Sequence, residues 1–172
     1  MLTNNFYQVL RANMSQKSVG SGIIDTSGNA RNASYSSQGM SYLFNAFSSP
    51  SNKGLTSQSL AGGIAFGTGD TPPTLNDYWL SGDLITTVGI VAVTITTAIA
   101  NGVYTFVNAI TVNNTGSDSI VINEMAIIPY VYYSGSSQVP AVVERQVLDT
   151  PLTLAPGEQG VITYTFNLPI VQ

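Results

Sequence analysis

The chain has 172 residues, of which 44% are hydrophobic and only 8% are charged, and its formal net charge is −4. It contains neither cysteine nor histidine, which excludes disulfide scaffolds, zinc sites built on these ligands and catalysis by a cysteine nucleophile or a histidine base. A single domain with so little charge must be covered by Ser, Thr, Asn, Gly and Gln or by other protein, and we favour an assembly subunit over a secreted module.

The helix signal of the chain lies in residues 1–14, where Asn4 or Asn5 can cap a helix. Apolar side chains recur there at a spacing of four, at Phe6, Leu10 and Met14. One such stripe on a short helix predicts docking onto the body of the same protein, with docking onto a partner as the alternative. The segment lacks the basic start and the apolar run of a signal peptide, so we expect no leader.

Residues 15–60 are rich in Ser, Gly and Asn, a composition that disfavours a packed interior. They nevertheless carry many apolar side chains, at Ile23, Ile24, Tyr35, Met40, Tyr42, Leu43, Phe44 and Phe47. We therefore predict an extended arm or strand-loop layer that becomes ordered only against a surface, its own or a neighbour's. The interface residues that we predict are Phe6, Leu10, Ile23, Ile24, Tyr42, Leu43, Phe44 and Phe47.

Charge is divided unevenly along the chain. Four of the five basic residues lie in residues 1–53, which sum to +3, whereas residues 54–172 carry Arg145 against eight acids and sum to −7. Basic residues this sparse do not form a nucleic-acid groove. The N-terminal segment is either solvated or lies on an acidic neighbour.

From residue 61 onward the sequence reads as strands separated by turns, beginning with a short strand at 64–66. Two long strand candidates fill residues 84–114 and flank Asn101-Gly102, which favours a two-residue hairpin turn because both positions take positive φ. Residues 84–100 are apolar enough to suggest a membrane span. Their many Thr and β-branched residues favour strands instead, and we expect no membrane association.

The C-terminal part continues the pattern of strands and turns. Asp149-Thr150-Pro151 is expected to end one strand, because proline cannot donate to a ladder, and Pro156-Gly157 is expected to form a tight turn. In the last strand Val161, Thr163 and Thr165 alternate with Ile162, Tyr164 and Phe166, so one face is large and apolar.

Short strands with almost no helix predict an all-β fold, an antiparallel β-sandwich of jelly-roll-like type with a short N-terminal helix and an extended N-terminal arm. We expect the helix and arm to occupy residues 1–60 and the sandwich domain to occupy residues 61–172.

Several polar clusters invite a functional hypothesis, and for each a structural role is favoured. Gly67-Thr68-Gly69 lacks the Gly-Lys-Ser/Thr of a phosphate loop and is interpreted as a glycine turn that leaves a strand. Glu144-Arg145 is interpreted as a surface ion pair. Acids close together in the sequence suggest a calcium site near Asp70, Asp77 and Asp83, with Asn76 beside them, but such residues commonly cap turns.

Trp79 is the only tryptophan, and with Tyr130, Tyr132 and Tyr133 it raises the alternative of stacking on a sugar ring. A position in the core or in an interface is favoured, because Trp79 sits beside Leu80 ahead of an apolar strand. No spacing of acids recommends a glycosidase. We therefore predict no enzyme, no catalytic residue, no cofactor and no bound metal.

Three segments, at residues 64–82, 110–127 and 142–166, together resemble the small β-sandwich virion proteins of tailed bacteriophages. The matching residues are Gly67, Thr68, Gly69, Asp77 and Leu80 in the first segment, Asn114, Ile122, Glu124 and Ile127 in the second, and Arg145, Leu148, Pro151, Pro156, Gly157 and Glu158 in the third. The resemblance leaves the first 60 residues unmatched. As a structural motif it implies fixed roles for Gly67, Gly69, Asp77, Trp79, Glu124, Arg145, Pro151, Pro156 and Gly157.

The resemblance implies a structural role in a particle assembled in the host cytoplasm. We expect a non-enzymatic virion protein, of decoration, head-fibre, collar or tail type, that forms a homo-oligomer or docks on capsid or tail subunits, without nucleic acid or membrane as a partner. The alternative is a carbohydrate-binding or adhesion module, whose glycan affinity would depend on Trp79.

Overall fold

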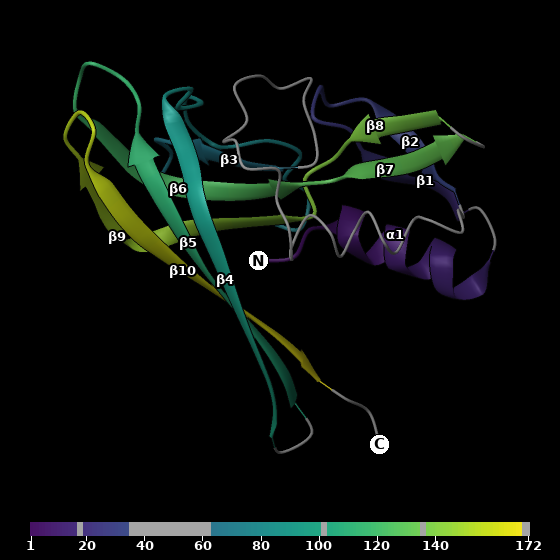
Figure 1. Cartoon of the computed structure of the whole chain (residues 1–172). Coiled ribbons are helices and arrows are strands. Elements are labelled where there is room, and N and C mark those ends of the chain that lie inside the picture. Colours follow the sequence, from purple (N-terminus) through teal and green to yellow (C-terminus); the bar gives the residue numbers. More distant parts are fainter. Residues whose placement is uncertain (17–18, 35–62, 101–102, 135–136, 170–172) are drawn as a thin grey trace.

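The computed structural model describes residues 1–16, 19–34, 63–100, 103–134 and 137–169 (Figure 1). The described part is all-β apart from one helix. In chain order its elements are α1 (Asn4–Ser15), β1 (Val19–Ile24), β2 (Ala30–Ala33), β3 (Gly63–Gly67), β4 (Val88–Ala100), β5 (Val103–Asn114), β6 (Ile120–Ile128), β7 (Tyr130–Ser134), β8 (Ser137–Pro140), β9 (Glu144–Leu154) and β10 (Gln159–Pro169).

Two three-stranded antiparallel sheets form the sandwich, with strand orders β10-β5-β4 and β3-β6-β9. Their inward side chains share one core, which includes Phe66 of β3, Ile110 of β5, Met125 of β6 and Ile162 of β10. The chain crosses from one sheet to the other between β3 and β4, between β5 and β6, and between β9 and β10. The antiparallel, all-β sandwich expected from the sequence is therefore confirmed.

The predicted long hairpin is confirmed by the pairing of β4 with β5. Ala100 is paired with Val103, so the connection has two residues, as the Asn-Gly dipeptide predicts, although residues 101–102 themselves lie outside the described part. β10 then pairs with the other side of β5 along its whole length. The alternation predicted for β10 is also confirmed, because Ile162 and Tyr164 are buried whereas Val161 is 58% exposed.

The prediction that Asp149-Thr150-Pro151 ends a strand is wrong, because β9 runs through these residues without interruption. Two features let proline remain inside the strand. β9 is at the edge of its sheet, where a missing N–H can face outward, and its register against β6 shifts between Ile122 and Glu124. The Pro156-Gly157 turn is confirmed: Gly157 has a φ of 75°, and Glu158 N donates to Ala155 O at 3.0 Å.

A side layer built from α1, the β1–β2 hairpin and the β7–β8 hairpin lies beside the sandwich (Figure 1). Backbone hydrogen bonds join its parts, from Ser34 N to Tyr132 O at 2.9 Å and from Thr26 N to Pro140 O at 3.1 Å. The first half of the predicted arm therefore lies on the chain's own body. Tyr42, Leu43, Phe44 and Phe47 lie outside the described residues.

The predicted helix is confirmed, but its buried stripe differs from the expected one. Phe6, Val9 and Ala12 are buried in the core, Leu10 is half-buried, and Met14 is 77% exposed. A spacing of three places these residues on one face as well as a spacing of four does. Because Phe6 and Ile23 are 2% and 0% exposed within their own chain, the prediction that they form an intermolecular interface is corrected.

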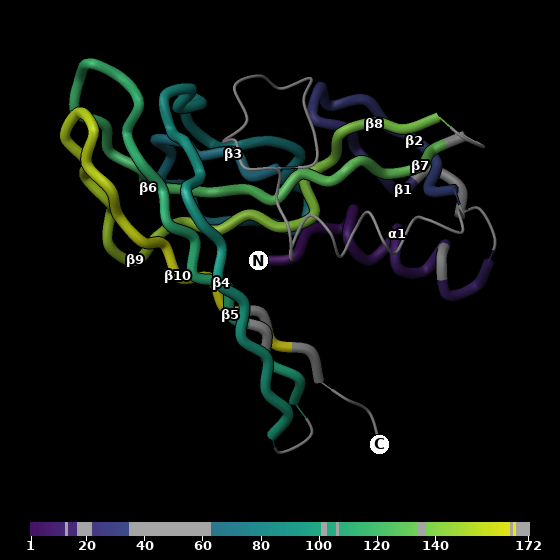
Figure 2. Tube along the Cα trace, in the orientation of Figure 1, coloured from purple at the N-terminus to yellow at the C-terminus, as the bar shows by residue number. Residues whose placement is uncertain are grey.

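The far ends of β4, β5 and β10 extend away from the rest of the chain as a three-stranded ribbon (Figures 1 and 2). Val88 and Ile90 at the start of β4 are buried in the core, whereas residues 96–100 are all exposed. No helix in the described ranges is long and apolar enough to cross a membrane.

Candidate functional site: a buried arginine–carboxylate network

The three segments of the sequence motif meet at one point, where Arg145 lies between Glu124 and Asp77. Arg145 comes from the start of β9, Glu124 from the neighbouring central strand β6, and Asp77 from the loop that follows β3. Arg145 is 1% exposed and Glu124 is 0% exposed. The prediction that Glu144 and Arg145 form a surface ion pair is therefore wrong, because both are buried and each pairs with another group.

Each nitrogen of the Arg145 guanidinium group has its own acceptor. Nε donates to Glu124 Oε2 at 2.8 Å, Nη1 donates to Asp77 Oδ2 at 2.6 Å, and Nη2 donates to the backbone oxygen of Thr71 at 2.6 Å. A buried guanidinium requires this degree of pairing, because an unpaired charge in the interior is strongly unfavourable. The Arg145 side chain thus holds the 68–83 loop against strands β6 and β9.

Glu124 accepts hydrogen bonds on both carboxylate oxygens. Backbone N–H groups of Gly69 and Gly82 donate to Oε1 at 3.0 and 2.8 Å, and the N–H and hydroxyl of Ser81 donate to Oε2 at 3.0 and 3.2 Å. Of the predicted glycine turn Gly67-Thr68-Gly69, Gly67 ends β3, and Thr68 and Gly69 begin the loop that leaves this strand. The loop does surround an anion, but that anion is the protein's own carboxylate.

The cover on both faces of β6 explains why a glutamate can occupy this central strand. Ile122, Met125 and Ile127 face the core between the two sheets, whereas Ala126 and Ile128 belong to a second apolar cluster with Leu80 and Val142. Glu124 lies on the same face of β6 as this second cluster, and the loop that contains Leu80 and Ser81 covers that face. The strand is therefore covered on both faces, and its charged residue faces backbone donors rather than water.

The pKa values of the two carboxylates follow from these contacts. Burial by itself would raise the pKa of Glu124, but the N–H groups of Ser81 and Gly82 and the Arg145 guanidinium outweigh it and lower the pKa. Burial is likewise opposed at Asp77, where the hydroxyl and N–H of Thr74 and then Arg145 lower the pKa. Both groups stay ionised at neutral pH, so neither suits the role of a general acid.

We expect acid to weaken the fold through this network. The folded-state pKa values lie below the ordinary 4.5 of Glu124 and 3.8 of Asp77, so their stabilisation is complete above those values and is lost as the pH falls through the folded-state values. The free energy of unfolding, measured by urea denaturation, should fall steadily below about pH 4.5. Burial raises the pKa of Glu144, although the nearby α-amino group of Met1 opposes this shift. Ionisation of Glu144 in the folded state therefore lowers the free energy of unfolding as the pH rises through its folded-state pKa.

Glu124→Gln isolates the contribution of the network, because the remaining carboxylates are unchanged. The variant should be less stable at pH 7 and should lose less stability on acidification than the unaltered chain. Equal acid-dependent losses in the two proteins would contradict the assignment.

The second and third motif segments also meet at the opposite end of the sandwich. Asn114, which is 1% exposed, donates from Nδ2 to the backbone oxygens of Asp118 and Leu154 at 2.7 and 3.1 Å. Its own backbone oxygen accepts from Gly157 N at 2.9 Å. The loop after β5 is thereby joined to the β9–β10 turn, so this motif residue also has a structural role.

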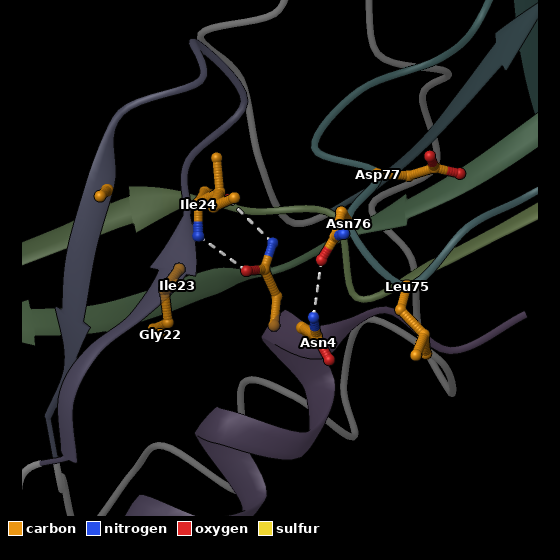
Figure 3. A pocket seen from close by; sticks show the side chains of 9 residues that line it. Asn4, Gly22, Ile23, Ile24, Leu75, Asn76 and Asp77 are labelled. Atoms are coloured by element: carbon orange, nitrogen blue, oxygen red, sulfur yellow. Dashed lines mark hydrogen bonds between the residues drawn. The ribbon is translucent and has the colours of Figure 1, made fainter.

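Two pockets flank the 71–81 loop. The first, of about 220 Å³, lies between the start of α1, β1 and residues 75–77 (Figure 3). Its polar side chains bond to each other or to the backbone: Asn4 donates to Asn76 at 2.8 Å, and Asn5 exchanges two hydrogen bonds of 2.8 Å with Ile24. The amide groups of Asn4 and Asn5 therefore bond within the pocket wall, and these hydrogen bonds hold α1 against β1 and the loop.

The second pocket, of about 260 Å³, is lined by Tyr78, Trp79 and Arg145 among others. Trp79 is half-buried and packs on the cluster of Ala65, Leu80, Ala126, Ile128 and Val142, as favoured from the sequence. Tyr78 is 45% exposed. Within the described ranges no three acidic side chains gather to hold a metal ion, and Asp77 of the calcium hypothesis is bound to Arg145.

Trp79→Ala should lower the free energy of unfolding by about 2 kcal/mol, because a half-buried indole loses its packing against the second cluster. Urea denaturation measures this loss, and a glycan array measures sugar binding by both proteins. The core position predicts lower stability with no glycan signal to lose. A sugar signal that disappears in the variant while stability is unchanged would favour the carbohydrate-binding alternative.

The comparisons with known proteins give no match to a family model, to a curated protein or to a solved structure.

Proposed function

We propose that the chain is a non-enzymatic structural subunit of a tailed-phage virion, which associates with its own copies and docks on neighbouring capsid or tail subunits. The observation that carries this proposal is the ribbon at the far ends of β4, β5 and β10. From Val88 to Asn114 and from Gln159 to Pro169 the sequence contains no charged residue at all. A projecting sheet without charge is poorly suited to water and well suited to burial by protein.

The exposed residues of the ribbon include large apolar side chains. Ile99, at the far end, is 70% exposed. Nearer the sandwich, on the outer face of the same sheet, Val91 and Val161 are 50% and 58% exposed. All nine acidic residues lie in other parts of the chain, so subunits that meet through their ribbons do not bring like charges together. Covering this area in an assembly contributes about 25 cal/mol for each Å² of apolar surface removed from water.

The buried network supports a structural role in a second way. Arg145, Glu124 and Asp77 are fully engaged with one another and with the backbone, and the two carboxylates have lowered pKa values. Such groups stabilise a loop rather than exchange protons with a substrate. A rigid body that presents an uncharged ribbon fits a particle component, and the phage assignment rests on the resemblance of the three motif segments.

The test is the protein composition of purified particles from the source that encodes the chain. Mass spectrometry of density-banded particles should find the chain in several copies per particle, at a fixed ratio to the major capsid protein. Its presence only in the particle-free fraction would contradict the proposal.

A further inference from the structure

The free edge of β4 is the most unusual feature of the ribbon. β4 has 13 residues, and among the described residues it pairs with β5 on one side and with no strand on the other. Natural edge strands are usually short, or carry lysine, proline or an inward charge that prevents pairing with another chain. β4 has no lysine, proline or charged residue along residues 91–100. Its register shift against β5, between Ile90 and Ala92, lies at the near end of that stretch and leaves residues 92–100 regularly paired.

The opposite edge of the sheet is less available. Tyr164, Thr165 and Asn167 of β10 line a pocket of about 340 Å³ together with Met1, Leu2 and Tyr7, so the N-terminal segment lies beside this strand. β10 also ends at Pro169, which cannot donate a backbone hydrogen bond. As far as the described residues show, β4 is therefore the one of the two edges that is open to a further strand.

Resting on the proposed function, we infer that β4 pairs antiparallel with β4 of a second copy of this chain, about a two-fold axis perpendicular to the sheet. Such an axis joins two three-stranded sheets into one six-stranded sheet and keeps the same face of each on the same side. An uncharged strand is complementary to itself in this arrangement, whereas a partner of a particular charge would find nothing to recognise.

The length of the free edge is sufficient for a stable contact. Residues 91–100 span about 33 Å at roughly 3.3 Å per residue. Pairing ten residues of each copy forms about ten backbone hydrogen bonds, which is the number found in a protein interface of standard size. The side chains that flank this pairing are Thr, Ala, Val and Ile, which suit a sheet surface.

The register of the sheet supplies a matched pair of positions for the test. Thr96 of β4 and Thr165 of β10 both lie opposite Val107 of β5, and both are exposed. The two threonines thus occupy the same row on opposite edges of one sheet. Thr96→Lys places two lysines at the proposed two-fold contact, whereas Thr165→Lys places the same charge on the other edge.

Light scattering on the full chain should show a dimer for the unaltered protein and for Thr165→Lys, and a monomer for Thr96→Lys, with equal folding of all three by circular dichroism. If the Thr96→Lys protein were still a dimer, or if only the Thr165→Lys protein were a monomer, the choice of β4 would be overturned. A monomeric unaltered chain would overturn the pairing itself.

The absence of cysteine permits a second, positional readout. Single cysteines placed in turn at residues 94–99 should form a disulfide-linked dimer on mild oxidation, with a maximum at one position and a decline on both sides of it, as a two-fold axis requires. Thr165→Cys should remain largely unlinked. A dimer by mass without this maximum would overturn the β4 contact and leave the proposed function intact, because the particle composition tests that function independently.

Discussion

Replacing Arg145 by methionine should lower the free energy of unfolding by about 3–5 kcal/mol, which is a large part of the stability of an ordinary domain. Methionine fills much of the same volume but leaves Glu124 without its cation in a site where the carboxylate is 0% exposed. Asp77 and the Thr71 oxygen lose their donors at the same time. Urea denaturation at pH 7 measures the loss.

Arg31→Met is the matched control for this substitution. Arg31 forms an ion pair with Asp25 at 2.9 Å, but its side chain is 35% exposed. The buried Asp25 keeps the hydrogen bonds that it accepts from the N–H groups of Ser27 and Asn29, at 3.0 and 2.9 Å, when the cation is removed. Loss of a partly solvated cation should therefore cost less than about 1 kcal/mol. Equal and small losses in the two variants would show that the buried network does not stabilise the fold.

Gly69→Ala should cost about 3 kcal/mol, because one added methyl group cannot be accommodated where the loop meets Glu124. A Cβ at residue 69 would lie 2.0 Å from Ser81 Oγ, 2.3 Å from Glu124 Oε1 and 2.4 Å from Gly82 N. The loop would have to move away, and the carboxylate would lose backbone donors. Thermal and urea denaturation should both report the loss.

Gly157→Ala separates this crowding from the conformational preference of glycine. Gly157 has a φ of 75°, but an added Cβ there meets no atom within 4 Å. Its cost should therefore be only the roughly 1–2 kcal/mol of a left-handed conformation. A Gly69→Ala protein more stable than Gly157→Ala would contradict the packing described for the loop.

Local turn chemistry made much of the fold predictable. Asn101-Gly102 predicted a two-residue connection, which the pairing of Ala100 with Val103 confirms. Pro156-Gly157 predicted the last turn, because the residues of a tight turn act on their own backbone. The prediction that a strand ends at Pro151 was wrong for a related reason. The local rule that proline ends a strand holds in the middle of a sheet, and the sequence does not reveal that β9 lies at an edge.

The contact between Arg145, Glu124 and Asp77 could not be predicted by pattern alone, since these residues lie in three separate segments. The resemblance singled out all three residues but not their contact. The available signal was Glu124, the one charged residue of a largely apolar strand, together with Arg145 as the one basic residue after residue 53. A buried carboxylate requires a cation, and the chain offers few.

The solution mass of the full-length chain, measured by light scattering over a range of concentrations, tests most directly the claim that this is an assembly subunit. We predict a mass of twice 18.1 kDa or a higher multiple, with dissociation only on dilution. A mass of 18.1 kDa at every concentration would contradict the claim that the uncharged ribbon joins copies of this chain.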